Sequence, residues 1–274
     1  MNVLSLFDGM SCGRIALDQL GKKVDNYYAC EIDKYAMQVS ATNYPNIVQL
    51  GNVEFVTKQT FGENKIDLII GGSPCQSFSK VGDGSGFDGS SRLFWEYVRL
   101  IKELKPKYFL LENVRMKKEW QDVISEALGV QPISICSSVL SAQKRGRLYW
   151  TNIPQNALPA GDSEKLQDVV DPTWSSEYPN FLDNKWGDQT RKSKCKNYDQ
   201  HDKSHCLTAT MYKGQIATFI TNNDGEVYKL TPNDCEALQT VPQNYTSCVS
   251  NTQRYKMLGN GWTISVIKHL LINL

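Results

Sequence analysis

The sequence has no apolar run long enough to span a membrane. Its apolar runs, such as residues 108–111, fall far short of the roughly 20 residues that a spanning helix needs. The amino terminus also lacks the basic region and cleavage site of an export signal. We therefore expect a cytoplasmic protein that is not secreted and has no membrane partner.

Two further features are missing, a charge excess and a disulfide framework. With 30 Lys and Arg against 29 Asp and Glu the net charge is +1, so a nucleic-acid surface must come from local clusters of basic residues. The 8 cysteines follow no framework spacing, and a chain of 274 residues needs no such staples. We expect free thiols, in one α/β domain with an insertion or in two small domains.

The dinucleotide fingerprint Gly-x-Gly-x-x-Gly is absent as well. Residues 2–7 predict a short strand, residues 8–13 a glycine-bearing turn and residues 14–20 an amphipathic helix. Gly9 and Gly13 would let a cofactor approach the backbone of this turn, although nothing in the turn indicates a phosphate ligand.

A carboxylate, Glu31, ends the next predicted strand. It follows the glycine turn by roughly 20 residues, the distance at which such folds place an acid that binds ribose hydroxyls. A solvated loop acid is an alternative that the spacing leaves open.

A cysteine is present where an α/β sheet places its ligands. Residues 71–76, Gly-Gly-Ser-Pro-Cys-Gln, follow an apolar strand and open a loop rich in Gly and Ser that runs to about Arg92. Cys75 then lies just past the carboxyl end of a strand, where Pro74 fixes the backbone and the glycines admit a ligand. We interpret Cys75 as a candidate nucleophile, the alternative being a small apolar residue in a tight turn.

Two more segments carry candidate polar groups. The strand at residues 108–111 delivers Glu112 to the same edge as Cys75, which suits this carboxyl to hand over or share a proton. Within residues 143–150, predicted as a strand, alternation would point Gln143, Arg145 and Arg147 the same way. A solvated face and a buried anchoring role are both compatible with this spacing.

Taken together, these segments resemble the DNA cytosine carbon-5 methyltransferase family. The resemblance is specific because six short blocks occur in the family's order along almost the whole chain. The blocks are Phe7-x-Gly9, Pro74-Cys75-Gln76, Glu112-Asn113-Val114, Gln143-x-Arg145-x-Arg147, Leu230-Thr231-Pro232-x-x-Cys235-Glu236-x-Leu238-Gln239 and Gly259-Asn260.

The resemblance implies a covalent mechanism on a flipped-out cytosine in double-stranded DNA. Cys75 would add to carbon 6 of the base, because carbon 5 alone is a poor nucleophile. Glu112 and Arg147 would meet the charge that develops at nitrogen 3 and oxygen 2, and Arg145 would support the site. The loop of residues 76–91 is the expected lid over the base.

The resemblance also implies S-adenosyl-L-methionine as cofactor, with S-adenosyl-L-homocysteine as product. Asn52 departs from the family, which usually has Asp there to accept from the adenine amino group, but an Asn carbonyl can still accept that bond. Gly261, where serine is frequent, is a second departure. The implied cofactor-binding residues are Phe7, Gly9, Gly13, Glu31, Ile32, Asn52, Val53, Pro74, Leu93, Asn260 and Gly261.

The implied fold is a Rossmann-like methyltransferase sheet of the α/β class with a small, mostly irregular target recognition domain. Residues 1–153 and 230–274 would form the catalytic domain, closed by the C-terminal helix, and residues 154–229 the recognition domain, in which basic and aromatic residues are interleaved. We expect no metal, because the His and Cys residues match no standard zinc spacing. The expected nucleic-acid contacts are Gln76, Ser79, Lys80, Arg92, Gln143, Arg191, Lys192, Lys194, Lys196 and Lys213.

Two other functions remain open alongside DNA methylation. Methylation of RNA cytosine uses the same chemistry, but its branch of the family usually carries a Cys-Phe-Thr signature that is absent from the recognition segment. An inactive, DNA-binding regulatory homologue would be expected to have lost Cys75, Glu112 or Arg147, and all three are present. Further expectations are a bacterial or phage-encoded monomer and a cognate restriction endonuclease as partner.

Overall fold

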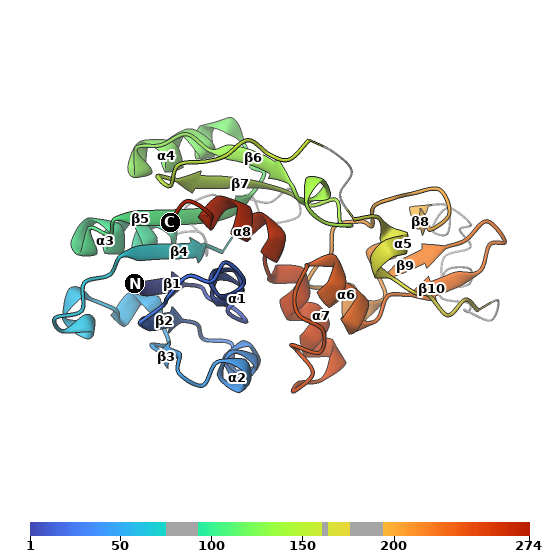
Figure 1. The fold of residues 1–274 in the computed structure, drawn as a ribbon, viewed down its shortest axis with the longest axis horizontal. Helices are drawn as coiled ribbons and strands as arrows, with labels where there is room; N and C mark the ends of the chain where they lie inside the picture. The colour runs from blue at the N-terminus through green and yellow to red at the C-terminus, as the bar shows by residue number, and fades with distance from the viewer. Residues whose placement is uncertain (75–92, 161–163, 176–193) are drawn as a thin grey trace. The chain divides into compact units, whose positions relative to one another are not determined.

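The computed structural model describes residues 1–74, 93–160, 164–175 and 194–274 (Figure 1). Backbone packing divides the chain into two compact units. The first comprises Met1–Cys136, Gly146–Ala157 and Ile267–Leu274, and the second Ser137–Arg145 and Leu158–Val266. The segment from 230 to 266, predicted to belong to the catalytic domain, therefore packs with the predicted recognition segment.

The first unit is built on a seven-stranded sheet with the order β3-β2-β1-β4-β5-β7-β6. The strand order reverses between β1 and β4, which makes their carboxyl ends a topological switch point of the kind that holds ligands in α/β sheets. Strands β1 to β5 pair in parallel, and β7 pairs antiparallel with both β5 and β6. The strands are β1 (Asn2–Leu6), β2 (Asn26–Cys30), β3 (Val48–Gln49), β4 (Leu68–Gly72), β5 (Tyr108–Val114), β6 (Ile133–Cys136) and β7 (Gly146–Thr151).

Helices between the strands explain why the central strands are apolar throughout. In β1 and β4, Leu4 and Ile69 are fully buried, as expected for a parallel sheet covered on both faces. Phe94 and Tyr97 of the third helix are fully buried as well. The helices are α1 (Cys12–Gln19), α2 (Lys34–Asn43), α3 (Phe94–Leu104) and α4 (Lys118–Leu128). The predicted α/β class is confirmed.

The C-terminal residues are fastened to the first unit by polar contacts. Lys22, just after α1, donates from Nζ to the carbonyl oxygens of Ile272 (3.1 Å) and Leu274 (2.8 Å). Gln155 donates from Nε2 to the Leu270 carbonyl oxygen at 3.1 Å. These residues follow or end α8 (Ile264–Leu271), a helix that carries residues of both units.

The second unit combines a three-stranded sheet with short helices. The sheet has the order β10-β9-β8, in which β9 and β10 form an antiparallel pair. Tyr255 donates to the Leu230 carbonyl oxygen at 2.7 Å, which joins a helix of this unit to the end of β10. The elements are α5 (Leu166–Val169), β8 (Lys196–Asn197), β9 (Phe219–Thr221), β10 (Val227–Lys229), α6 (Pro232–Leu238) and α7 (Asn251–Asn260), with a 3-10 turn η7 (Met211–Lys213).

Candidate active site at the carboxyl edge of the sheet

The turn after β1 is tight because three of its residues have a left-handed backbone conformation. Phe7, Gly9 and Ser11 have φ angles of 58°, 60° and 64°, a region that costs little for Gly and more for the other two. The curl brings the Gly9 N–H to within 2.8 Å of Glu31 Oε2, at the end of the neighbouring strand β2. The predicted cofactor residues Phe7, Gly9 and Glu31 are therefore together in one place.

The carboxylate of Glu31 is held by backbone N–H groups on both oxygens. Oε1 accepts from the N–H of Ile32 at 2.7 Å and of Asp33 at 2.8 Å, while Oε2 accepts from Gly9. A carboxylate has about four acceptor positions, so these three bonds fix the group and still leave one position, on Oε2, for a ligand hydroxyl. The Ile32 side chain beside it is 76% exposed and offers apolar surface to a planar ligand.

Gly13 serves packing. A Cβ added there would lie 2.1 Å from Ile70 Cδ1 and 3.1 Å from the Tyr27 hydroxyl. Only glycine lets α1 approach β4 and β2 this closely, so Gly13 sets the position of the helix that follows the turn. The side of Gly13 on which a Cβ would lie therefore faces Ile70 and Tyr27, and its contact with the cofactor stays a prediction.

The turn itself contains a buried carboxyl, that of Asp8, which was not recognised from the sequence. Its oxygens accept from the Tyr27 hydroxyl at 2.8 Å and the Ser11 hydroxyl at 2.5 Å. Burial raises the pKa of Asp8 to about 6, against the opposing effect of these hydrogen bonds. Asp8 connects the turn to β2 through its bond to Tyr27.

Asn52 lies at the start of a 3-10 turn, η1 (Val53–Phe55), and caps it. Its Oδ1 accepts from the Glu54 N–H at 3.0 Å, and its Nδ2 donates to Glu54 Oε2 at 3.0 Å. The carboxylate of Glu54 therefore fixes which way the amide points. The Asn52 oxygen keeps one lone pair, in agreement with the acceptor role implied for this position.

Arg99 of α3 is hydrogen-bonded to the backbone of this turn, a contact that the sequence patterns did not predict. Its Nη2 donates to the carbonyl oxygens of Val56 at 2.9 Å and Val53 at 3.4 Å. Glu96 and Glu103 flank the guanidinium at 2.7 Å and 3.0 Å, so its orientation is fixed on both sides. A basic residue in an amphipathic helix gives no such signal because the contact is 43 residues distant in sequence.

The structure brings Glu112 and Arg147 together at the edge of the sheet. Arg147 Nε lies 2.9 Å from Glu112 Oε1, and the two side chains are only 15% and 11% exposed. Gly72, two residues before Pro74, pairs in register with Glu112. The end of β4, where Cys75 follows, is therefore beside this ion pair.

The connection out of β4 is anchored to β5. Asn113 Nδ2 donates to Ser73 Oγ at 3.0 Å, and both side chains are buried. Cys75 itself lies outside the described residues, as do Gln76, Ser79, Lys80, Arg92, Arg191 and Lys192.

Arg145 does not lie on the same strand as Arg147, contrary to the prediction from alternation. Strand β7 begins at Gly146, and Arg145 belongs to the second unit. Its guanidinium donates to the carbonyl oxygens of Leu207 at 2.9 Å, Gly259 at 3.1 Å and Gly261 at 2.9 Å. Arg145 therefore joins two segments of backbone, one at Leu207 and one at the end of α7, which is the buried anchoring role.

Gln143 has the same kind of role. Its side chain is fully buried, and it donates to Gln239 Oε1 at 3.0 Å while accepting from the Leu207 N–H at 2.9 Å. The predicted nucleic-acid contact does not fit this structure, because Gln143 exposes no surface. The predicted strand breaks here because the Ser137 hydroxyl donates to the Gln143 carbonyl oxygen at 2.6 Å and accepts from the Arg145 N–H at 3.1 Å.

The remaining predicted residues lie in both units. Leu93 precedes α3 and packs against the core of the first unit, whereas Asn260 and Gly261 are at the end of α7 in the second. Lys194, Lys196 and Lys213 are in the second unit, where Lys213 Nζ lies 5.7 Å from the centre of the Tyr212 ring. Within the described ranges no three His, Cys, Asp or Glu side chains are grouped to hold a metal ion. In the same part of the chain, no helix has the length and apolarity to cross a membrane.

The turn after β1, the Glu31 carboxylate and the Glu112–Arg147 pair all lie at the carboxyl ends of the parallel strands of the first unit. The family model for C-5 cytosine-specific DNA methylases matches residues 1–128 and 132–274. The chain belongs to this family of cytosine carbon-5 methyltransferases, and the predicted resemblance is confirmed.

Individual relatives agree with this assignment. The Type II methyltransferase M1.ScrFI of Lactococcus lactis subsp. cremoris is 27% identical, over 97% of this chain and 75% of that protein. The Type II methyltransferase M.HhaI of Haemophilus parahaemolyticus is 25% identical, over 100% of this chain and 94% of that protein. A solved structure of a Spodoptera frugiperda DNMT2 mutant has the same fold, with a TM-score of 0.78 at 20% identity, covering 98% of each chain.

Proposed function

We propose that the protein transfers a methyl group from S-adenosyl-L-methionine to carbon 5 of a flipped-out cytosine in duplex DNA. The observation that carries this proposal is the Glu112–Arg147 pair beside the end of β4. A carboxyl and a guanidinium in contact can bind the acceptor and donor edges of a single pyrimidine. DNA is favoured over RNA because relatives matched along nearly the whole chain are named Type II methyltransferases.

The protein groups divide the chemistry between them. The thiolate of Cys75 forms a bond to carbon 6 of cytosine, and the electron pair of the 5,6 double bond moves to carbon 5. Arg147 donates to oxygen 2 and Glu112 shares a proton with nitrogen 3, so that the charge gained by the ring is met by fixed groups. Once carbon 5 has bonded the methyl group and S-adenosyl-L-homocysteine has left, water takes the proton from carbon 5 and the electron pair of that C–H bond re-forms the 5,6 double bond. The bond to Cys75 breaks in the same step, and its electron pair returns to sulfur as the thiolate.

The residues of the first unit fit the cofactor. Glu31 would accept from the ribose with its remaining acceptor position, Ile32 would contact the adenine ring, and Asn52 would accept from the adenine amino group. Phe7, Gly9, Val53, Pro74 and Leu93 would line the same site, and Asn260 and Gly261, in the second unit, stay predicted cofactor residues. When bound, S-adenosyl-L-methionine supplies an electrophilic methyl group.

One experiment tests the substrate and the mechanism together. The protein is incubated with methyl-labelled S-adenosyl-L-methionine and either unmethylated bacterial DNA or transfer RNA, and the labelled position is mapped. We expect 5-methylcytosine in DNA, and none when Cys75→Ser replaces the wild type. Label in RNA alone would show that RNA, and not DNA, is the substrate of this reaction. Label in neither substrate would contradict the proposal.

The Type II relatives support a biological role as well. We propose that the methylated DNA is thereby protected from a cognate restriction endonuclease in the cytoplasm of a bacterial or phage-infected cell, and that the enzyme is a monomer. Plasmid DNA from an expressing strain should resist enzymes that cut at the mapped site. Light scattering on the purified protein should give a mass of about 31.0 kDa.

A further inference from the structure

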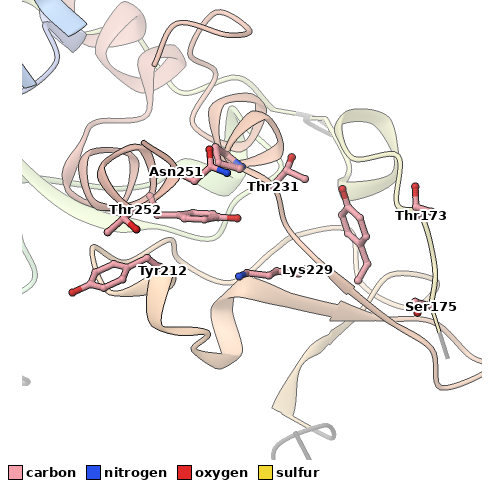
Figure 2. Close-up of a pocket in the computed structure, with 10 residues that line it drawn as sticks. Thr173, Ser175, Tyr212, Lys229, Thr231, Asn251 and Thr252 are labelled. Atoms are coloured by element: carbon pink, nitrogen blue, oxygen red, sulfur yellow. The ribbon is translucent and has the colours of Figure 1, made fainter. Parts of the chain in front are cut away.

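The second unit contains a cavity of about 460 Å³ that none of the roles above uses. It is bounded by the end of β10, the first turn of α7 and the 3-10 turn η7. Figure 2 shows the amine of Lys229 pointing toward the side of the cavity where Tyr212 and Thr252 lie, with Thr173 and Ser175 on the other side. The volume is in the range of small-ligand sites.

Hydrogen-bond donors dominate the Lys229 side of this cavity. Within the described part of the chain no carboxylate forms an ion pair with Lys229, whose Nζ lies 5.9 Å from the centre of the Tyr255 ring. The Thr252 hydroxyl and Asn251 amide line the same side. Ser250, the N-cap residue of the ten-residue helix α7, makes no side-chain capping bond, so the helix end adds positive potential there.

Two acidic groups, Asp234 and Asp171, act on Tyr228 at the other end of the cavity, and Asp234 is already engaged. Asp234 Oδ2 accepts from the Tyr228 hydroxyl at 2.9 Å and from the Thr231 N–H and hydroxyl at 2.7 Å and 2.8 Å. A carboxylate with three donors needs no further cation. Lys229 is therefore left as the cation of the cavity, and an anion is the ligand that its surroundings favour.

The side chains that line the cavity indicate which kind of molecule the anionic group belongs to. Tyr212 is 38% exposed and Tyr255 lies beside Lys229, so aromatic surface is adjacent to the donors. Lys213, stacked on Tyr212, adds a second cation next to the cavity. Amine, hydroxyl and aromatic groups in one hollow suit a phosphate with its attached sugar.

We propose that this cavity binds a backbone phosphate and its sugar from the substrate DNA, with Lys229 as the charged ligand of the phosphate. This inference rests on the proposed function, since it assigns a new contact on the same substrate. Lys229 is the last residue of β10 and Thr252 lies in the first turn of α7, so the contact would anchor the duplex to two different elements of the second unit.

The test measures binding of a fluorescein-labelled, mixed-sequence DNA duplex over a series of salt concentrations. For Lys229→Met, which keeps the alkyl stem over Tyr255, we expect about tenfold weaker binding in low salt. The slope of log affinity against log salt should fall by about 0.9, the value for one lost phosphate contact. Thr252→Val should weaken binding a few-fold and leave the slope unchanged, because it removes a hydroxyl and no charge.

The matched control is Lys65→Met. Lys65 lies before β4, and its carbonyl accepts from Asn2 at the amino ends of the strands, the opposite edge of the sheet from the candidate site. The substitution Lys65→Met removes one exposed positive charge, and the affinity for the duplex should stay within twofold of wild type. S-adenosyl-L-homocysteine binding by calorimetry, unchanged in all three variants, verifies that the proteins are folded.

Three outcomes would overturn the assignment. One is a Lys229→Met variant that binds the duplex like Lys65→Met. Another is a change in affinity for adenosine monophosphate but not for the duplex, which would make the cavity a site for free nucleotides. The third is a loss confined to an RNA hairpin. Because binding is measured without turnover, an absence of methyl transfer by the wild type would count against the proposed function separately.

Discussion

Arg147 Nε lies 2.9 Å from Glu112 Oε1, between the adjacent antiparallel strands β7 and β5. The two residues are 35 positions apart, and the sheet alone brings them together beside the end of β4. Because both side chains are largely buried, each compensates the charge of the other in the absence of substrate. In the proposed mechanism, Glu112 and Arg147 would replace this contact with hydrogen bonds to the bound pyrimidine.

Replacing Glu112 with Gln should remove the shared proton while preserving the shape of the site. We expect methyl transfer to fall by about 10²- to 10⁴-fold, the range for loss of a general acid or base. S-adenosyl-L-homocysteine affinity should remain within twofold, since Glu112 is not among the residues proposed to bind the cofactor. Single-turnover transfer and calorimetry give the two numbers, and a parallel loss of cofactor binding would instead indicate a disrupted sheet edge.

Asp8 predicts a specific pH dependence of stability. Its pKa is raised to about 6 by burial, above the ordinary value of 3.8, so the folded state retains the proton over a range in which the unfolded state has lost it. The contribution of Asp8 to the free energy of unfolding is therefore highest in acid and falls as pH rises from about 4 to 6. The size of the fall is on the order of 3 kcal/mol at 1.36 kcal/mol per pKa unit.

Asp8→Asn removes the titration and keeps a carbonyl acceptor for Tyr27. Urea unfolding at pH 4, 5, 6 and 7 should show a difference in unfolding free energy between variant and wild type that shifts in favour of the variant with rising pH. A difference that stays constant across this series would mean that Asp8 does not titrate there. The comparison cancels the carboxylates common to both proteins.

Asn52→Asp should weaken cofactor binding although it restores the family's residue. In the structure Asn52 Nδ2 donates to Glu54 Oε2 at 3.0 Å, so Asp would put two carboxylates in contact. We expect about fivefold weaker S-adenosyl-L-homocysteine binding at low salt, since like charges at an exposed pair cost on the order of 1 kcal/mol. The double variant Asn52→Asp with Glu54→Gln should recover binding, because Gln donates to Asp. Equal affinities for single and double variants would show that the two positions are not coupled.

Gly259→Ala should destabilise the second unit. An added Cβ would lie 2.1 Å from the Thr208 carbonyl carbon, and the Gly259 carbonyl oxygen accepts from Arg145. Overpacking of this kind costs about 1–3 kcal/mol, so the thermal midpoint should fall by several degrees. Gln253→Ala in the same helix is the control and should change it little. An unaltered midpoint for Gly259→Ala would mean that the segments separate without cost.

Deleting the residues after Gly259 should abolish cofactor binding. The deletion removes α8, whose Ile267 and Leu270 are buried, and the carbonyl groups that Lys22 and Gln155 bind. Calorimetry with S-adenosyl-L-homocysteine checks this on the soluble fraction. A soluble truncated protein that still binds the ligand would contradict the prediction.

The local patterns were sufficient for the strands and for where some of the predicted site residues lie. Glu31 and Glu112 each end an apolar strand, and parallel strands bring their carboxyl ends to one edge of a sheet whatever the loops between them do. For this reason the alternation of strand, turn and helix predicted the α/β fold and the turn at which we propose the cofactor. The ordered blocks predicted the family.

The sequence by itself therefore determined which residues end the strands and what chemistry they carry. Only the tertiary structure decided that Arg145 and Gln143 bind backbone within the second unit, that Asp8 and Arg99 hold the turn after β1 and the turn at residues 53–55, and that Lys229 faces a cavity. Each of these depends on hydrogen bonds or packing between segments distant in sequence. Periodicity describes the environment of a residue along its own strand or helix, whereas the partners of a buried polar group are set by which other segments pack against it.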